Sequence, residues 1–356
     1  GPPLSTIYFG GGTPSLLSPF QVKKILDHLK EHFGFQDGLE LTLEIDPGSF
    51  DEKSLNGYLE SGFNRMSLGG QSFDNVVLKK LGRRHNPEDF KQACSLLNTA
   101  YKRGELLTWS LDLIQNLPDQ KVITWRDQLK QAIETHAPHL SIYDLSVEPG
   151  TVFAEKHKKG HLNLPKQDLA IEISALTSAT LKKEGFARYE ISNYALPGHA
   201  SRHNRVYWSG ANWWAFGQGA TSSAWGRRFS RPKNQMDYYK WVSDQESGLI
   251  ESSLQKVNVE KLNIDDLIFV GLRRREGVDL EELAIEWGWD IEDRTKYLTS
   301  LMNYWEDFIK NGTLKNCGMR FYLTDPQGME ISNSVLVAML RWWDSLPSNA
   351  VLPTIV

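Results

Sequence analysis

The sequence predicts an α/β protein in which a parallel sheet curves into a barrel, followed by a smaller, mainly helical domain. Short apolar runs alternate with helical segments five times before residue 190, a pattern typical of right-handed βαβ crossovers and a parallel sheet. Each run ends in a polar or glycine-rich loop, and convergence of so many strand ends favours a barrel over an open sheet. Near Gly226 the composition shifts and helix signals replace this alternation.

The first strand–helix unit carries clear local signals. Ser5–Phe9 is an apolar run that predicts a strand. Ser18 is expected to cap the next helix, with Pro19 at its first position and Gln21 completing a capping box. Gly34 is expected to end that helix.

The following units repeat the pattern. Further strands are expected at Leu39–Ile45, Arg65–Gly69, Leu107–Ile114 and His139–Ser146. Helices are expected at Asp51–Ser61, Asn75–Leu81, Pro87–Arg103, Thr124–Thr135 and Lys166–Glu184.

The last third of the chain predicts a separate helical domain. Its helices are expected at Lys261–Arg275, Asp279–Trp287, Asp293–Lys310 and Ser332–Trp343, with a short β element at Arg320–Thr324. Helices followed by a small hairpin and a terminal helix resemble a winged-helix module. We therefore expect domains at 1–225 and 226–356. A structural or lid role is favoured over DNA binding, because the chain is mildly acidic.

Composition narrows the functional class. The net charge is −4 and the pI about 6.2, so nothing indicates a nucleic-acid partner. No apolar run approaches the roughly 20 residues of a membrane span. The two cysteines, Cys94 and Cys317, make neither a disulfide framework nor a zinc site, and Cys94 is expected to be a buried structural thiol. We expect a cytoplasmic protein, and an organellar location stays open because the chain does not begin with Met.

Polar groups at several strand ends suggest a binding site. Gly10–Gly12 expose bare backbone but match neither a phosphate-binding P-loop nor a dinucleotide fingerprint, so on their own they fit a tight turn equally well. Glu44 and Asp112 place carboxylates at strand ends, Gln71 adds an amide, and Arg83 follows one helix later. Carboxylates can accept hydrogen bonds from ribose hydroxyls, and a guanidinium can form an ion pair with a carboxylate. Backbone carbonyls can accept hydrogen bonds from an ammonium group. Each group alone also fits a structural salt bridge.

Six segments together carry a family resemblance. They are FGGGTPSLL, LEIDPGSF, NRMSLGGQSF, LGRRH, LDLIQNLPDQ and LSIYDLSVEPGT, in this order. They resemble the radical S-adenosylmethionine (SAM) enzymes related to oxygen-independent coproporphyrinogen III oxidase (HemN), over nearly the whole chain. The resemblance implies a partial (β/α)6 barrel that uses SAM and a [4Fe-4S] cluster.

The resemblance also implies roles for individual residues. The methionine part of SAM would lie against Gly11, Gly12 and Thr13. The other positions that match cofactor contacts of the family are Glu44, Gln71, Arg83, Asp112 and Ser146, the last near the adenosyl group. Gly217–Ala220 resembles the last barrel loop, near the adenine. Gly70 stands where relatives commonly carry Val.

The sequence departs from the family pattern near its N-terminal end. The cluster of the family is held by Cys-x3-Cys-x2-Cys upstream of the glycine run, and thiolates are the usual ligands of such a cluster. Nothing of that kind precedes Gly10, and Cys94 and Cys317 are not at motif spacing. We therefore expect no metal ligands in this chain, and we expect the cluster cysteines and the first barrel strand upstream of Gly1.

A further motif resembles the haem-chaperone branch of the family, HemW. In SRHNRVYW the pattern H-N-x-x-Y-W is formed by His203, Asn204, Tyr207 and Trp208, and YEISNYALPG at 189–198 is similar to the same branch. The resemblance implies that the protein binds haem and passes it to a membrane protein. An imidazole can ligate haem iron, and aromatic rings can cover a porphyrin face.

Two alternatives stay open at this point. Without the resemblance, His203 and Asn204 fit a hydrogen-bonded turn with the aromatics in a core, and His199 and His85 are weaker haem candidates. The alternative function is oxygen-independent coproporphyrinogen III oxidase, which generates a 5′-deoxyadenosyl radical. That enzyme would need the missing cysteines and a place for a second cofactor molecule, which the sequence does not reveal.

Overall fold

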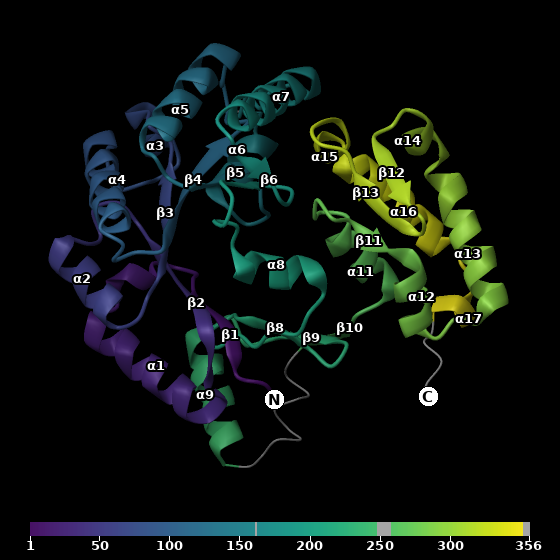
Figure 1. Ribbon diagram of the computed structural model, residues 1–356, viewed down its shortest axis with the longest axis horizontal. Coiled ribbons are helices and arrows are strands. Elements are labelled where there is room, and N and C mark those ends of the chain that lie inside the picture. Colours follow the sequence, from purple (N-terminus) through teal and green to yellow (C-terminus); the bar gives the residue numbers. More distant parts are fainter. Residues whose placement is uncertain (161, 248–257, 352–356) are drawn as a thin grey trace. The chain divides into compact units, whose positions relative to one another are not determined.

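The structure, a computed structural model, describes residues 1–160, 162–247 and 258–351 (Figure 1). The chain divides into two compact units, Gly1–His203 and Asn204–Val356. This division falls earlier than the boundary expected at 225/226, so that residues 204–225 belong with the second unit.

The first unit is built on a seven-stranded sheet with the order β1-β2-β3-β4-β5-β7-β6. Its parallel strands are β1 (Leu4–Phe9), β2 (Phe35–Ile45), β3 (Arg65–Gln71), β4 (Thr108–Gln115) and β5 (His139–Asp144). Two short strands, β6 (Ala187–Arg188) and β7 (Asn193–Ala195), extend the sheet in antiparallel fashion. The predicted α/β fold with a parallel central sheet is confirmed. Among the described residues β1 pairs only with β2, which makes it an edge strand.

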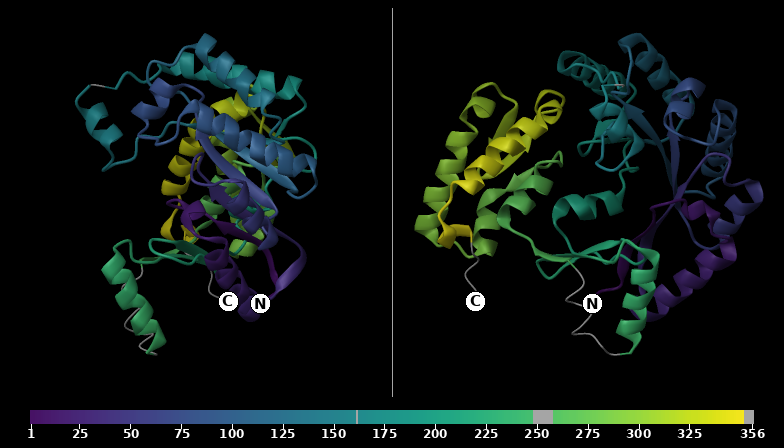
Figure 2. Two further views of the ribbon diagram at one scale, coloured as in Figure 1. Left: turned by 90° about the vertical axis from the view of Figure 1, so that its left-hand side faces the viewer. Right: turned by 180° about the vertical axis from the view of Figure 1, so that it is seen from behind.

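Helices cover the outer side of this curved sheet (Figures 1 and 2). They are α1 (Pro19–Phe33), α2 (Glu52–Glu60), α4 (Pro87–Lys102), α5 (Val122–Glu134) and α7 (Gln167–Lys183). Two shorter helices, α3 (Asn75–Lys80) and α6 (Val152–Lys158), follow the ends of β3 and β5, and a 3-10 turn η1 lies at Pro14–Leu16. The predicted capping box is present: Ser18 Oγ accepts from the N–H of Gln21, and Gln21 Oε1 accepts from the N–H of Ser18. Gly34 closes α1 at φ +69°.

Alternation along the strands separates an apolar face from a polar one. Leu43, Leu68, Leu111 and Leu140 are fully buried, and each such side chain contributes about 1.5–3 kcal/mol by leaving water. Leu68 is in register with Leu111, and Leu111 with Leu140. Because side chains alternate across a strand, the intervening polar positions face the other way. A polar row therefore lines the opposite face, near the carboxyl ends of the strands.

The second unit begins in α8 (Arg202–Ser209) and contains two small antiparallel sheets. The first has the order β10-β9-β8 and was not predicted from the sequence. Its elements are β8 (Thr221–Ala224), β9 (Arg227–Ser230) and β10 (Asn258–Lys261), with α9 at Gln235–Glu246.

The second sheet, with the order β11-β13-β12, belongs to the helical region that was expected to resemble a winged helix. Its elements are α11 (Ile264–Gly271), β11 (Val278–Asp279), α12 (Leu280–Trp287), α13 (Ile291–Tyr304), α14 (Glu306–Lys310), β12 (Leu314–Cys317), β13 (Arg320–Leu323), α15 (Gln327–Glu330), α16 (Ser332–Asp344) and α17 (Ser348–Val351). The helix expected at Asp293–Lys310 is broken at Trp305, whose fully buried ring donates through Nε1 to the carbonyl of Val335 at 3.1 Å. None of the described helices has both the length and the apolar character of a membrane crossing.

Candidate functional site

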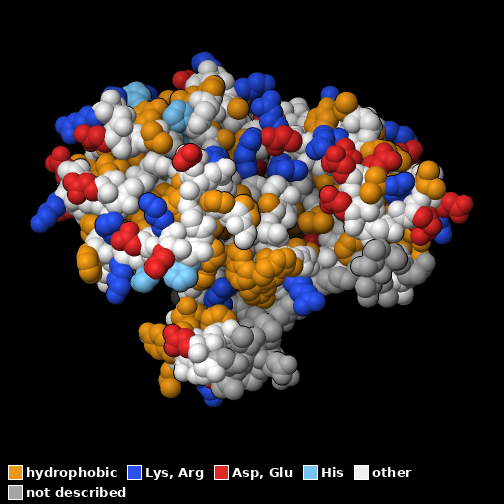
Figure 3. All heavy atoms as spheres, turned by 60° about the horizontal axis from the view of Figure 1, so that its bottom comes forward, with side chains coloured by type: hydrophobic (Ala, Val, Ile, Leu, Met, Phe, Trp, Pro, Cys, Tyr) orange, Lys and Arg blue, Asp and Glu red, His pale blue; other side chains and the backbone are white. Residues whose placement is uncertain are grey.

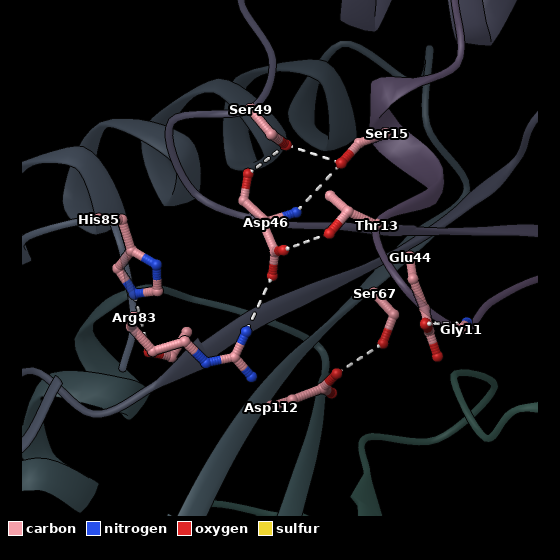
Figure 4. Close-up of polar contacts among 11 residues, drawn as sticks. Gly11, Thr13, Ser15, Glu44, Asp46, Ser49, Ser67, Arg83, His85 and Asp112 are labelled. Carbon is pink, nitrogen blue, oxygen red and sulfur yellow. Dashed lines mark hydrogen bonds and ion pairs between the residues drawn. The ribbon is translucent and has the colours of Figure 1, made fainter. Parts of the chain in front are cut away.

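The glycine run and Glu44 are joined at the carboxyl ends of β1 and β2 (Figure 4). Glu44 accepts from the backbone N–H of Gly11 at 3.0 Å and from the Tyr8 hydroxyl at 2.7 Å. Gly11 and Gly12 have φ of +77° and +62°, and, chain neighbours aside, no atom of the described residues lies within 4 Å of the place where a Cβ would stand on either. Glycine adopts this left-handed conformation without steric cost. The loop is therefore held from one side by Glu44 and presents bare backbone to open space on the other.

Asp46 is a central acceptor that the sequence analysis missed. The Thr13 hydroxyl donates to Asp46 Oδ2 at 3.3 Å, and Arg83 forms an ion pair with Oδ1 at 3.3 Å (Figure 4). Both side chains of the ion pair are about one-third exposed, so the pair adds little to stability. Its effect is to orient the guanidinium towards the strand ends. The only sequence signal was the acidic residue immediately after the strand, before Pro47.

Gln71 occupies an unusual backbone conformation at the end of β3. Its φ is +64°, and the register between β3 and β4 shifts between Leu68 and Gln71. Gln71 Nε2 and Asp46 Oδ1 lie 3.2 and 3.1 Å from the position of a Cβ on Gly69, so the two groups share the space that this glycine leaves open. Left-handed non-glycine residues are costly and cluster at functional sites, which supports a ligand role for the amide.

Asp112 is the most perturbed carboxyl group of the set. Its Oδ2 accepts from Ser67 Oγ at 2.9 Å, and Ser110 Oγ donates to Ser67 Oγ at 2.8 Å. Its Oδ1 is buried without a hydrogen-bond partner among the described residues. Burial raises the pKa of Asp112 to about 6; the nearby Glu44 adds to the rise, and the hydroxyls of Ser141 and Ser67 oppose it. A buried acceptor without a donor is suited to a ligand hydroxyl.

Ser146 stands apart from this group. It lies beyond the end of β5, is exposed, and donates to Glu148 Oε1 at 2.6 Å. The strand ends thus bring Gly11, Thr13, Gln71 and Arg83 around Glu44, Asp46 and Asp112, whereas among the described contacts Ser146 is tied to its own loop.

The histidine of the H-N-x-x-Y-W motif is packed on the first strand rather than held in a turn. His203 lies in α8, its Nδ1 is 2.9 Å from Thr6 Oγ1, and its ring stacks on Tyr8 with centroids 5.0 Å apart. Its backbone N–H donates to Glu40 Oε1 at 2.8 Å. Burial lowers the pKa of His203 to about 4, against the opposing effect of Glu40. The imidazole is therefore neutral at pH 7, the form that binds metal ions.

The aromatic residues of the motif have partners within the second unit. The Tyr207 ring meets Trp213 edge to face at 4.9 Å, and the guanidinium of Arg273 lies 5.6 Å from the centre of the Trp208 ring. Asn204 follows His203 directly on α8.

The weaker haem candidates have structural roles. His199 Nδ1 is 2.9 Å from Thr108 Oγ1, and its Nε2 is 3.3 Å from the Tyr101 hydroxyl. His85 is buried and donates from Nε2 to the carbonyl of Gly70 at 3.2 Å.

The segment Gly217–Ala220, which was expected near the adenine, lies in the second unit. There the N–H of Gly219 donates to the carbonyl of Pro232 at 2.9 Å.

The cysteines do not fit an iron–sulfur cluster. The chain has two, Cys94 is buried with its pKa raised to about 12 by burial, and Cys317 is exposed in β12. A cluster needs thiolates, and no set of three is present in this chain. The one group of possible metal ligands found among the described residues, His28, Glu31 and His32, is exposed on α1.

Comparisons with known proteins identify relatives of this chain. A sequence profile of the radical SAM superfamily matches residues 2–123. The chain is 36% identical over 353 residues to heme chaperone HemW of Synechocystis sp., covering 95% of this chain and 83% of that protein. It is 32% identical to heme chaperone HemW of Bacillus subtilis, covering 95% and 86%. Among solved structures it resembles coproporphyrinogen III oxidase (HemN) from Escherichia coli, a radical SAM enzyme, with a TM-score of 0.74, 22% identity, and coverage of 94% of this chain and 77% of that one. That likeness supports the fold alone.

Proposed function

The chain belongs to the HemW family of radical SAM proteins, and on that premise we propose that it binds haem and passes it to an acceptor protein. The observation that carries the proposal is the segment His203–Trp208. It places a neutral imidazole and two aromatic rings on one helix. A neutral imidazole can ligate iron, and indole and phenol rings can cover a porphyrin.

Ligation by His203 would compete with the contacts that hold its ring. The ring stacks on Tyr8, whose hydroxyl donates to Glu44, and Glu44 in turn accepts from the N–H of Gly11. Movement of the His203 ring towards iron would therefore loosen Tyr8 and, through Glu44, the glycine loop. We propose that the haem segment and the glycine loop influence each other through this chain of contacts.

We further propose that the strand ends of the first unit bind SAM. The bare backbone of Gly11 and Gly12 would bind the ammonium group of SAM, and Arg83 would bind its carboxylate. Glu44 and Asp112 would accept hydrogen bonds from the ribose hydroxyls. Gln71 and Thr13 would line the remainder of the site. In this family SAM is used together with a [4Fe-4S] cluster, for which this chain offers no thiolates. In this proposal the residues at the strand ends bind SAM and orient it.

We propose that the acceptor is a membrane-bound haem protein and that this protein acts in the cytoplasm.

The test of haem binding is a titration of the protein with haemin, followed by the Soret band. We expect a saturable shift of that band for the wild type. We expect His203→Ala to weaken binding about tenfold or more and to change the position of the band, because an iron–imidazole bond is lost.

The matched control is His136→Asn, which replaces an exposed histidine at φ +61° by a residue that tolerates this conformation. It should titrate like the wild type.

Haem transfer is tested with a haem-depleted membrane cytochrome in vesicles. Loss of bound haem from the protein to these vesicles, but not to empty vesicles, would support transfer. A wild-type protein without a saturable Soret shift would contradict the proposal, and anaerobic, reducing conversion of coproporphyrinogen III would point to the oxidase instead.

A further inference from the structure

The β8–β9 hairpin of the second unit exposes large aromatic side chains at its turn. Trp225 is 74% exposed and Trp214 is 44% exposed. Their ring centroids lie 5.1 Å apart and their planes meet at 78°, so that the two indoles form a corner. Figure 3, which brings the bottom of the view in Figure 1 forward, shows hydrophobic side chains gathered beside basic ones on this face.

The backbone at Trp225 is unfavourable for the residue it carries. The turn between Ala224 and Arg227 has two residues, Trp225 and Gly226, with φ of +54° and +67°. Two positive φ values in a two-residue hairpin are typical of a type I′ turn, where Asn, Asp and Gly are preferred. A bulky side chain in this conformation is strained, and exposure of its indole gains little from folding. The hairpin therefore gains no stability from the strained backbone of Trp225 or from its exposed indole.

Neighbouring side chains pack against Trp214, one of the two indoles of the corner. Phe229 meets Trp214 edge to face at 5.6 Å. Beneath it, the buried guanidinium of Arg231 lies 6.0 Å from the Phe229 ring and donates to Ser222 Oγ at 2.9 Å. Aromatic groups that are fixed before binding lose little conformational entropy when a ligand arrives.

A cation adjoins the corner. Arg227 follows the turn directly, is exposed, and forms no ion pair among the described residues. Because side chains alternate along a strand, Arg227 and Phe229 project from the same face of β9. The exposed surface thus combines a flat apolar corner with a positive charge at its edge.

The corner is continuous with the proposed haem segment. Trp213, which precedes Trp214, exchanges two backbone hydrogen bonds with Ser223 of β8, at 2.8 and 3.0 Å. On its other side the Trp213 ring packs against Tyr207 of the H-N-x-x-Y-W motif at 4.9 Å.

We infer that this corner binds the planar ring of a porphyrin, with one indole against its face, the other against its edge, and Arg227 on a propionate carboxylate. The inference rests on the proposed function, which supplies the ring. A porphyrin matches the site because it is flat and apolar and carries carboxylates at one edge, and carboxylates pair well with a guanidinium.

The test compares haemin with iron-free protoporphyrin IX, because stacking on the corner needs no iron whereas axial ligation does. Trp225→Asn should lower the affinity for both porphyrins about tenfold, and Trp214→Ala should act in the same direction. Since Asn is preferred in this turn, the melting temperature of Trp225→Asn should equal or exceed that of the wild type. Arg227→Glu should weaken binding of both porphyrins, less so at high salt.

Matched controls are Phe20→Ala, which removes a 78% exposed ring on α1, and Lys315→Glu, which reverses an exposed charge on β12; both should bind as the wild type does. His203→Ala should reduce the affinity for haemin more than that for the iron-free ring. If the wild type binds haemin while Trp225→Asn and Trp214→Ala bind both porphyrins unchanged, the inference is overturned and the proposed function stands. A wild type that binds neither porphyrin would overturn both.

Discussion

Gly70→Val is expected to destabilise the protein by about 3 kcal/mol or more, at the upper end of what overpacking a core costs. A Cβ on Gly70 would stand 1.9 Å from Cζ of Phe90. The Phe90 ring is fully buried and stacks on Phe73 at 4.5 Å, so it cannot move aside at low cost. Thermal or urea unfolding of the variant measures the loss, and Gly70→Ala should already show most of it.

Phe90→Ala supplies the control. Alone it should cost about 3–5 kcal/mol by leaving a cavity, but a valine at position 70 would refill part of that space. The double variant should therefore be more stable than the sum of the two single effects by about 1–3 kcal/mol. Strict additivity would show that the two positions do not compete for one volume. By the same argument, relatives that carry Val where this chain has Gly70 are expected to carry a residue smaller than Phe at position 90.

Much of the fold followed from local signals. The capping box of Ser18 and Gln21, the stop at Gly34 and the alternation along β2 to β5 predicted the elements that the structure contains. The break at Trp305 escaped prediction because a buried indole anchored to Val335 overrides a continuous helical pattern. The β8–β10 sheet escaped it because its short strands, TSSA and RRFS among them, lack an apolar alternation.

The candidate site was predictable where a residue type is unusual in its context. Glu44 and Asp112 stood out as carboxylates inside apolar strands, and both lie at strand ends that the structure brings together. Asp46 was missed because an acidic residue before a proline also suits an ordinary turn. The stacking of His203 on Tyr8 joins residues 195 positions apart, and no local pattern reports such a contact.

Asp112→Asn is expected to be more stable than the wild type at pH 8, by about 2 kcal/mol. The folded protein raises the pKa of Asp112 from 3.8 to about 6, which means that folding favours the protonated carboxyl group. The stabilising contribution of the wild-type residue is therefore complete below about pH 4 and is lost as the pH rises through about 6. The asparagine carries no charge and escapes this loss, although its buried amide keeps a smaller desolvation cost. Urea unfolding at pH 4, 6 and 8 should show the advantage of the variant growing with pH.

A stabilising substitution at a strand end identifies a carboxylate kept for binding rather than for folding. Asp112→Asn should accordingly weaken SAM binding, measured by calorimetry, because the unpartnered Oδ1 is lost as a charged acceptor for a ribose hydroxyl. Asp144→Asn is the matched control: Asp144 Oδ1 accepts from Gln115 Nε2 at 2.9 Å and from Asn116 Nδ2 at 2.7 Å, so its replacement should lower stability at pH 8. If Asp112→Asn were less stable than the wild type at pH 8 and bound SAM equally well, Asp112 would be a structural group, and the binding role assigned to the end of β4 would be wrong.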